Sequence, residues 1–135
     1  MTLKANELKV GDSYQEEICN NLSRTQIVMY AGTSGDYNPL HSDPESARRS
    51  GFDRPILHGL ATFGIACRAL MLRLCGNDPD RVAGQDGRFS SPVFPGEEIA
   101  VDMWHEETGV ASYVARVPSR DVVVLTNGRF EYRVR

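Results

Sequence analysis

The densest group of residues able to do chemistry lies in residues 34–41, which read SGDYNPLH. Asp36 supplies a carboxylate, Asn38 an amide and His41 an imidazole, and Pro39 stiffens the backbone between them. At neutral pH an ordinary aspartate is charged and a histidine is largely neutral, so the pair offers two proton acceptors, one of which can later donate. Such a group can bind one water molecule and accept or return its proton, as the addition or removal of water requires.

The same residues also have a purely structural interpretation. Asx residues favour turns and caps, so Asp36 and Asn38 could serve the loop alone, with His41 packed beside a helix end. A second polar cluster, FDRPILHG, favours a functional interpretation because it places His58 and Gly59 where a long apolar segment begins. The free N–H groups at the start of a helix can hold an oxyanion.

Two short helices and one long helix are expected to position these clusters. Residues 23–26, SRTQ, have the form of a capping box, and the glycines of residues 32–35 should end the helix that follows. Residues 43–45, DPE, predict a second short helix that Gly51 closes. Residues 58–74 contain no proline and are rich in helix formers, so they predict the principal helix.

The second half of the chain is typical of antiparallel strands. After the turn-rich residues 75–87, the segments RFSSPVF, EEIAVDMWHEE, VASYVARVPS and DVVVLTNGRFEYRVR are enriched in β-branched and aromatic residues. The segment DSYQEEICNNL near the N-terminus could add a further strand. A strand of eight residues spans about 27 Å, close to the length of the principal helix. The sequence therefore predicts an α+β fold in which a curved antiparallel sheet wraps around one central helix.

Length and composition limit the class of protein. The 135 residues fit one domain, residues 1–135, and no linker or repeat divides them. The net charge of -3 gives no global positive field for nucleic acid, and no segment is apolar enough to suggest a membrane span or a signal peptide. Cys19, Cys67 and Cys75 form no C-x-x-C pair, which argues against disulfides and structural zinc and favours the cytoplasm.

Other chemistries fit the sequence less well. Asp36, His41 and His58 could in principle ligate a metal, but their spacing matches no H-E-x-x-H pattern. A nucleophile elbow would need glycine where Asp36 stands, and no phosphate-binding glycine loop is present. His105 is expected to be a surface or sheet residue and Trp104 a packing residue. Cys67 and Cys75 are also expected to pack.

Three segments agree with the motifs of a known family and occur in its order. They are an aromatic-small-SGDxNPLH-alanine signature at Tyr30, Ala31, residues 34–41 and Ala47, then RPILHG at residues 54–59, then RFSSPVFPGE at residues 88–97. Over nearly its whole length the chain resembles the MaoC-like, (R)-specific enoyl-CoA hydratase and dehydratase family. The resemblance implies a single MaoC-like domain with the hot-dog fold.

The resemblance also implies roles for individual residues. Asp36 and His41 would hold and activate water, Asn38 would orient them, and Gly59 would supply a backbone N–H to the thioester oxygen. The implied reaction is the (R)-specific hydration of trans-2-enoyl-CoA to (R)-3-hydroxyacyl-CoA, or the reverse dehydration, with no metal or cofactor. The family assembles its sites from paired units, so a dimer or larger oligomer, or a complex with a related hot-dog subunit, is expected.

Five further residues are candidates for binding the substrate. Arg88 could meet a phosphate of CoA or of an acyl-carrier pantetheine arm, although a surface arginine at a strand start is the usual alternative. The candidates for lining the acyl pocket lie on the principal helix and are Leu60, Phe63, Cys67 and Leu70.

Two other functions stay open. A hot-dog acyl-CoA thioesterase would direct the water to the thioester carbonyl, and an acyl-thioester-binding subunit of a hetero-oligomeric hydratase would leave the pair unused. The Asp36-to-His41 motif favours the hydratase over both. The sequence leaves open the acyl length, the carrier, the direction of reaction and which of Asp36 and His41 delivers the proton to the α-carbon.

Overall fold

The computed structural model of the chain describes residues 13–19 and 22–134. Its strands and helices are β1 (Ser13–Cys19), α1 (Arg24–Ser34), α2 (Pro44–Arg49), α3 (Gly59–Leu74), β2 (Val82–Phe89), β3 (Ile99–Glu107), β4 (Val110–Val117) and β5 (Val122–Tyr132). Three short 3-10 turns, η2 (Pro39–His41), η3 (Pro79–Arg81) and η4 (Pro118–Arg120), lie between them. None of the helices in these described ranges has the length and apolar character that a membrane crossing requires.

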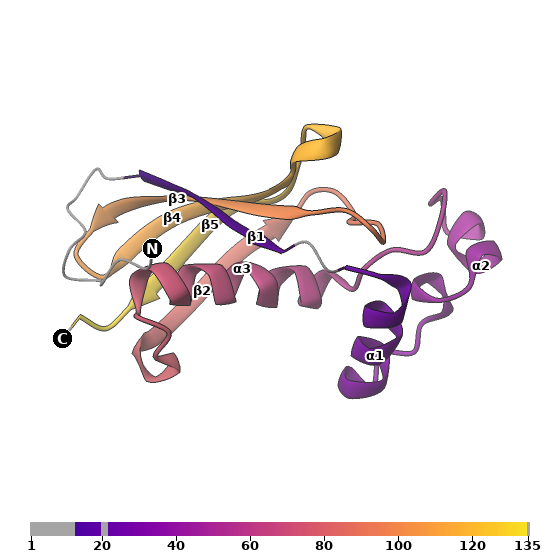
Figure 1. Cartoon of the computed structure of the whole chain (residues 1–135), viewed down its shortest axis with the longest axis horizontal. Helices are drawn as coiled ribbons and strands as arrows, with labels where there is room; N and C mark the ends of the chain where they lie inside the picture. Colours follow the sequence, from indigo (N-terminus) through magenta and orange to yellow (C-terminus); the bar gives the residue numbers. More distant parts are fainter. Residues whose placement is uncertain (1–12, 20–21, 135) are drawn as a thin grey trace.

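The five strands form one antiparallel sheet in the order β1-β3-β4-β5-β2. The long helix α3 runs along one face of this sheet, as Figure 1 shows. This is the α+β, hot-dog arrangement expected from the sequence, in which a curved sheet packs around a single helix. That expectation is confirmed.

The core lies between α3 and the sheet. On β4 every second residue is buried, which is the period of a strand with one face toward a core. The facing side of α3 carries small alanines together with leucines, so the helix axis can approach the sheet closely. The buried side chains that α3 and β4 contribute are Ala61, Thr62, Ala66, Ala69, Leu70, Leu74, Ala111, Tyr113, Ala115 and Val117.

The strand β2 begins earlier than the sequence pattern indicated. RFSSPVF was expected to be a strand and residues 75–87 to be turns, but the strand is Val82–Phe89, and no strand extends over residues 90–97. That expectation is wrong because β2 is an edge strand, whose register against β5 shifts twice. Irregular edge strands tolerate the glycines that made this segment look like a turn.

Alternation along β3 separates two neighbouring residues. His105 faces the core and shares a 3.0 Å hydrogen bond with the Tyr132 hydroxyl. Trp104 was expected to be a packing residue; it points the opposite way from His105 and is 41% exposed, so its side chain is only partly covered. The packing expected of Cys75 is confirmed, and burial raises the pKa of its thiol to about 11.

The remaining helices form a separate region beyond the N-terminal end of α3 (Figure 1). We call residues 24–58, which include α1, η2 and α2, the overhang. The Ser23 hydroxyl accepts a hydrogen bond from the Gln26 N–H and caps α1, while Asp43 accepts one from the Ser46 N–H and caps α2. Both predicted helix starts are therefore confirmed.

Candidate active site

The loop after α1 is built from short-range hydrogen bonds. Gly35 ends the helix in the left-handed region, at φ 78°. The Asp36 N–H then donates to the Ser34 hydroxyl at 3.2 Å, and the Asn38 N–H donates to Asp36 Oδ1 at 3.2 Å. The Leu40 N–H donates in turn to Asn38 Oδ1 at 3.1 Å. One carboxylate oxygen of Asp36 is thus tied into the loop, which fixes the direction of the other.

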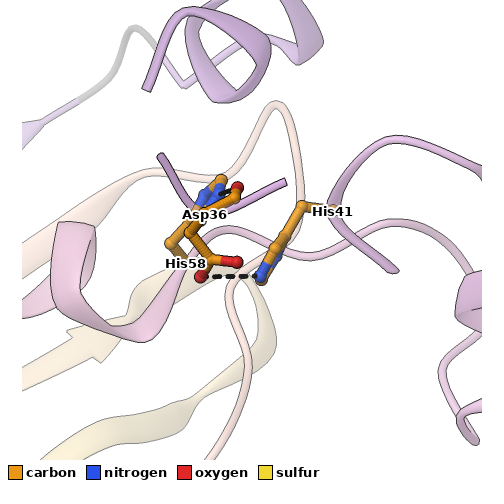
Figure 2. A group of neighbouring side chains, drawn as sticks. All are labelled: Asp36, His41 and His58. Atoms are coloured by element: carbon orange, nitrogen blue, oxygen red, sulfur yellow. Dashed lines mark hydrogen bonds and ion pairs between the residues drawn. The ribbon is translucent and has the colours of Figure 1, made fainter. Parts of the chain in front are cut away.

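That second oxygen faces the imidazole of His41 (Figure 2). Asp36 Oδ2 lies 3.7 Å from His41 Nε2, and the side chains are 53% and 10% exposed, respectively. His41 Nδ1 lies 2.8 Å from the Ile56 carbonyl oxygen, which can only accept, so Nδ1 carries the hydrogen. In a neutral ring Nε2 is then an acceptor. Two proton acceptors therefore lie next to each other, one on the half-exposed Asp36 and one on the mostly buried His41, within reach of the same water.

Asn38 acts on this pair through the backbone. Its N–H holds Asp36 Oδ1, while its side-chain oxygen caps the turn η2 that ends at His41. Asn38 also lines, with His41 and Tyr37, a cavity of about 270 Å³. The residue is therefore placed between the two groups that it was expected to orient.

A third side chain, His58, completes the group in Figure 2. Its ring stacks on His41, with centroids 3.7 Å apart and planes 19° apart, and its Nε2 donates to the backbone carbonyl of Asp36 at 3.1 Å. His58 was expected at the start of the long helix and was considered only as an unfavoured metal ligand, with no part in the catalytic pair. The available signal was its position directly before Gly59 within RPILHG.

The same three residues have donor atoms within 4.8 Å of one another, as a metal site would. Their geometry does not favour one. An imidazole binds a metal through a lone pair in its ring plane, and the planes of His41 and His58 are stacked and nearly parallel. One ion cannot lie in both planes at bonding distance.

Gly59 stands at the first position of α3, where backbone N–H groups have no acceptor within the helix. It borders a cavity of about 300 Å³ that Phe52, Phe89 and Ser90 also line. A Cβ at position 59 would lie 3.2 Å from Phe89 Cε1, so glycine leaves room that a side chain would crowd. The first turn of α3 thus presents N–H groups and a positive helix end close to the Asp36 loop.

The segment before α3 is held by the loop that follows β2. The Leu57 N–H donates to the Val93 carbonyl at 2.8 Å, and Arg54 Nη1 donates to the Pro95 carbonyl at 3.2 Å. Arg54 also lies over the Phe94 ring, at 4.8 Å from its centroid. These contacts join the RPILHG and RFSSPVFPGE segments, two of the three family motifs in the sequence.

An ion pair between the buried Glu97 carboxylate and the partly exposed Arg120 secures that loop on its other side. Arg120 Nη2 donates to Glu97 Oε1 at 2.9 Å, and the guanidinium lies 4.9 Å from the Phe94 centroid. Burial is the strongest single influence on Glu97 and acts to raise the pKa of its carboxyl group. Hydrogen bonds from Arg120 and the Phe94 N–H, with the Arg120 charge, outweigh burial and lower this pKa.

The five residues expected to bind substrate lie in different environments. Leu60 is 67% exposed and lines a cavity of about 500 Å³ that Tyr30 and Arg68 also border. Phe63 and Cys67 are partly buried and pack against the core, whereas Leu70 is fully buried within it. Arg88 is exposed on β2, opposite Thr126 of β5.

Residues 5–125 match the family model described as MaoC like domain. The chain belongs to the MaoC-like domain family. It is 44% identical over 118 residues to "Enoyl-CoA hydratase 2, peroxisomal" of Arabidopsis thaliana, covering 87% of this chain and 38% of that protein. The chain therefore spans about two fifths of the length of such curated relatives.

Two solved structures extend the comparison of this MaoC-like chain. A MaoC-like dehydratase from Phytophthora capsici superposes with a TM-score of 0.84 and 42% identity, covering 93% of this chain and 41% of that one. The (R)-hydratase from A. caviae involved in PHA biosynthesis superposes with a TM-score of 0.75 and 25% identity, covering 97% of this chain and all of that one. The resemblance stated from the sequence is confirmed.

Proposed function

We propose that the chain catalyses the hydration of a trans-2-enoyl thioester to an (R)-3-hydroxyacyl thioester, or the reverse dehydration. The observation that carries the proposal is the pairing of Asp36 Oδ2 with His41 Nε2 at 3.7 Å, beside the helix start that Gly59 opens. The (R)-hydratase whose fold this chain shares along its whole length supports the same reaction class. The enoyl-CoA hydratase named among the relatives supports the same substrate class.

The proposed chemistry follows from the charges that develop. The thioester carbonyl oxygen accepts a hydrogen bond from the Gly59 N–H, and the positive end of α3 stabilises the enolate-like charge. Electron density drawn from the conjugated alkene makes its β-carbon electrophilic. Water adds there, giving up one proton to the Asp36 and His41 pair, and the same pair returns one proton to the α-carbon.

Other residues are proposed to bind the carrier and the acyl group of the substrate. The exposed guanidinium of Arg88 is assigned to a phosphate of CoA or of an acyl-carrier pantetheine arm. Leu60, Phe63 and Cys67 are assigned to the acyl group, and the buried Leu70 supports them from the core.

We also propose a paired assembly, with a second copy or a related hot-dog subunit. Large apolar side chains on the overhang and at the start of α3 support it, because Val28, Met29 and Leu60 are each more than half exposed. The cytoplasm is the proposed compartment, on the composition and on the odd number of cysteines, which form no C-x-x-C pair.

A panel of short, medium and bulky trans-2-enoyl-CoA substrates tests the reaction. Loss of the conjugated-enoyl absorbance without release of free thiol is the expected result, with Asp36→Asn as the inactive control. Release of free CoA would instead identify a thioesterase. Binding of the thioester by folded protein with no turnover of any substrate would support the role of a binding subunit.

A further inference from the structure

The buried ring of His58 touches both members of the candidate catalytic pair, and this contact has no part in the chemistry described above. We propose that His58 is a positioning residue that holds the Asp36 backbone and the His41 ring in one arrangement. The inference rests on the proposed function, because it names a further residue for that same reaction.

The first contact is a directed hydrogen bond. His58 Nε2 lies 3.1 Å from the backbone oxygen of Asp36. A carbonyl oxygen can only accept, so the bond requires the hydrogen to be on Nε2. It ties the Asp36 carbonyl to a residue 22 positions away, whereas the Asp36 N–H bond to the Ser34 hydroxyl and the Asn38 N–H bond to the Asp36 carboxylate are both made within the loop. Without it, the carboxylate would be held by a short exposed loop alone.

The second contact is a stack on the other catalytic group. The rings of His58 and His41 lie 3.7 Å apart at 19°, and Tyr30 packs on His58 at 4.8 Å and 56°. His41 is also held in its own plane by its bond to the Ile56 carbonyl. The stack therefore restrains the tilt of His41 Nε2, the atom that faces Asp36.

The role of His58 is indirect because the ring cannot reach a substrate. The residue is 2% exposed, Nε2 is engaged with Asp36, and Nδ1 is buried with no partner among the described residues. No ring nitrogen of His58 is left for proton transfer at the surface. It can act on the reaction only through the two residues that it touches.

The backbone of His58 connects these contacts to the third part of the site. It is the N-cap of α3, and its carbonyl accepts from the N–H groups of Ala61 and Thr62 at 3.0 and 3.2 Å. The ring that holds Asp36 and His41 is thus attached to the helix start that presents the Gly59 N–H. One residue sets the carboxylate, the imidazole and the oxyanion donor relative to one another.

Two substitutions separate the bond from the stack. His58→Gln places an amide N–H near the position of Nε2 but removes the ring, and His58→Phe keeps a ring but removes the donor. His105→Gln is the matched control, because His105 is also buried, also bonded through Nε2 and also has Nδ1 without a partner among the described residues. It lies on β3, facing Tyr132 and not the Asp36 loop.

We expect His58→Phe to lower kcat about a hundredfold, the scale on which a small misplacement of reacting groups slows catalysis. His58→Gln should recover part of this loss and lower kcat about tenfold, with KM within about threefold of wild type in both variants. Folding is checked by thermal unfolding, and His105→Gln should keep the wild-type kcat.

Four results would overturn the proposal: a folded His58→Phe variant with near wild-type kcat, a loss confined to KM, a His58→Gln variant as weak as His58→Phe, or an equal loss of kcat in His105→Gln. If wild type hydrates no enoyl thioester, the proposed function fails first. Imidazole ¹⁵N spectra then decide the positioning: a hydrogen on His58 Nε2 and a shifted His41 signal in His58→Phe support it, and a hydrogen on Nδ1 overturns it.

Discussion

The overhang and the sheet with its helix α3 are held together by different forces. In the overhang, α1 and α2 each bury a single residue, Ile27 and Ala47, and the loops are fixed by caps, Asx turns and backbone bonds. The sheet and α3 enclose most of a continuous apolar core, to which the overhang adds only Ile27 and Leu57. Burial of apolar area is the dominant stabilising term in folding, whereas one cap contributes only about 1 kcal/mol.

The candidate catalytic pair belongs entirely to the weaker region. Asp36 and His41 lie in the overhang, and His58 and Gly59 link them to the stronger region. Most of the stability therefore comes from residues that take no part in the chemistry. Substitutions in the overhang should change activity more than stability, and substitutions in the core should do the opposite.

The largest effect should come from the pair itself. Asp36→Asn and His41→Ala each remove a proton acceptor, so kcat should fall about a thousandfold, within the range of general acid–base catalysis. Asp36→Asn should leave the melting temperature within about 2 °C of wild type, because that side chain is half exposed, whereas His41→Ala removes a mostly buried ring and should lower it by about 5 °C. Steady-state kinetics beside calorimetry checks both statements, and hydration near the wild-type rate by either variant would remove that residue from the mechanism.

A substitution that leaves a cavity in the core should lower stability and leave kcat nearly unchanged. Leu70 is fully buried in α3, so Leu70→Ala should cost about 3 kcal/mol of unfolding free energy. The kcat of the folded variant should change little. Urea unfolding measures the loss, and Leu70→Met is the volume-conserving control. Unchanged stability with altered preference for acyl length would instead place Leu70 on the substrate pocket.

Loss of the ion pair between Arg120 and Glu97, which secures the loop after β2, should have an intermediate effect on stability. Arg120→Met leaves the buried Glu97 carboxylate without its charged donor, at a cost of about 2 kcal/mol near pH 7. The pKa of Glu97 is lowered in the folded state, so the pair contributes stability above the ordinary glutamate pKa and loses it as pH falls through the lowered value.

Unfolding at about pH 7 and about pH 4 should therefore show a smaller acid-induced loss of stability in Arg120→Met than in wild type. Arg129→Met is the control, since its pair with Glu131 is exposed. An equal loss in wild type and Arg120→Met between the two pH values would contradict the assigned role of the pair.

The smallest effect should come from a helix cap. Ser23→Ala removes the acceptor for the Gln26 N–H at the start of α1, which costs about 1 kcal/mol. If this cost falls on the overhang alone, kcat should drop by at most about fivefold. Ser23→Asp restores an acceptor and should recover the wild-type rate. A cap loss that lowers only the melting temperature would show that the overhang and the core unfold as one unit.

The sequence predicted the local geometry of the overhang better than the strand limits. The caps at Ser23 and Asp43 were recognisable because they depend on residues three positions apart. The start of β2 at Val82 was not, because it depends on pairing with Tyr132, fifty residues away. A helix cap depends on residues close together in the sequence, so it can be predicted from them. The limits of an edge strand depend on pairing with a distant strand, so they cannot.

The candidate site was predictable in part for the same reason. Asp36 and His41 lie in one motif, five positions apart, so the short loop between them is enough to bring them together. The contact of His58 with both is a tertiary one, across separations of 22 and 17 positions, and no spacing rule indicated it. Family resemblance marked the segment around His58 but did not say which atoms it touches.

The configuration of the hydrated product tests the central claim most directly. Purified protein is incubated with a trans-2-enoyl-CoA, and the 3-hydroxyacyl product is resolved by chiral chromatography, with Asp36→Asn in parallel. We expect (R)-3-hydroxyacyl-CoA from wild type at about a thousand times the rate of the variant, because one Asp36 and His41 pair handles both protons on one side of the substrate. An (S) or racemic product, or equal product from Asp36→Asn, would contradict the account.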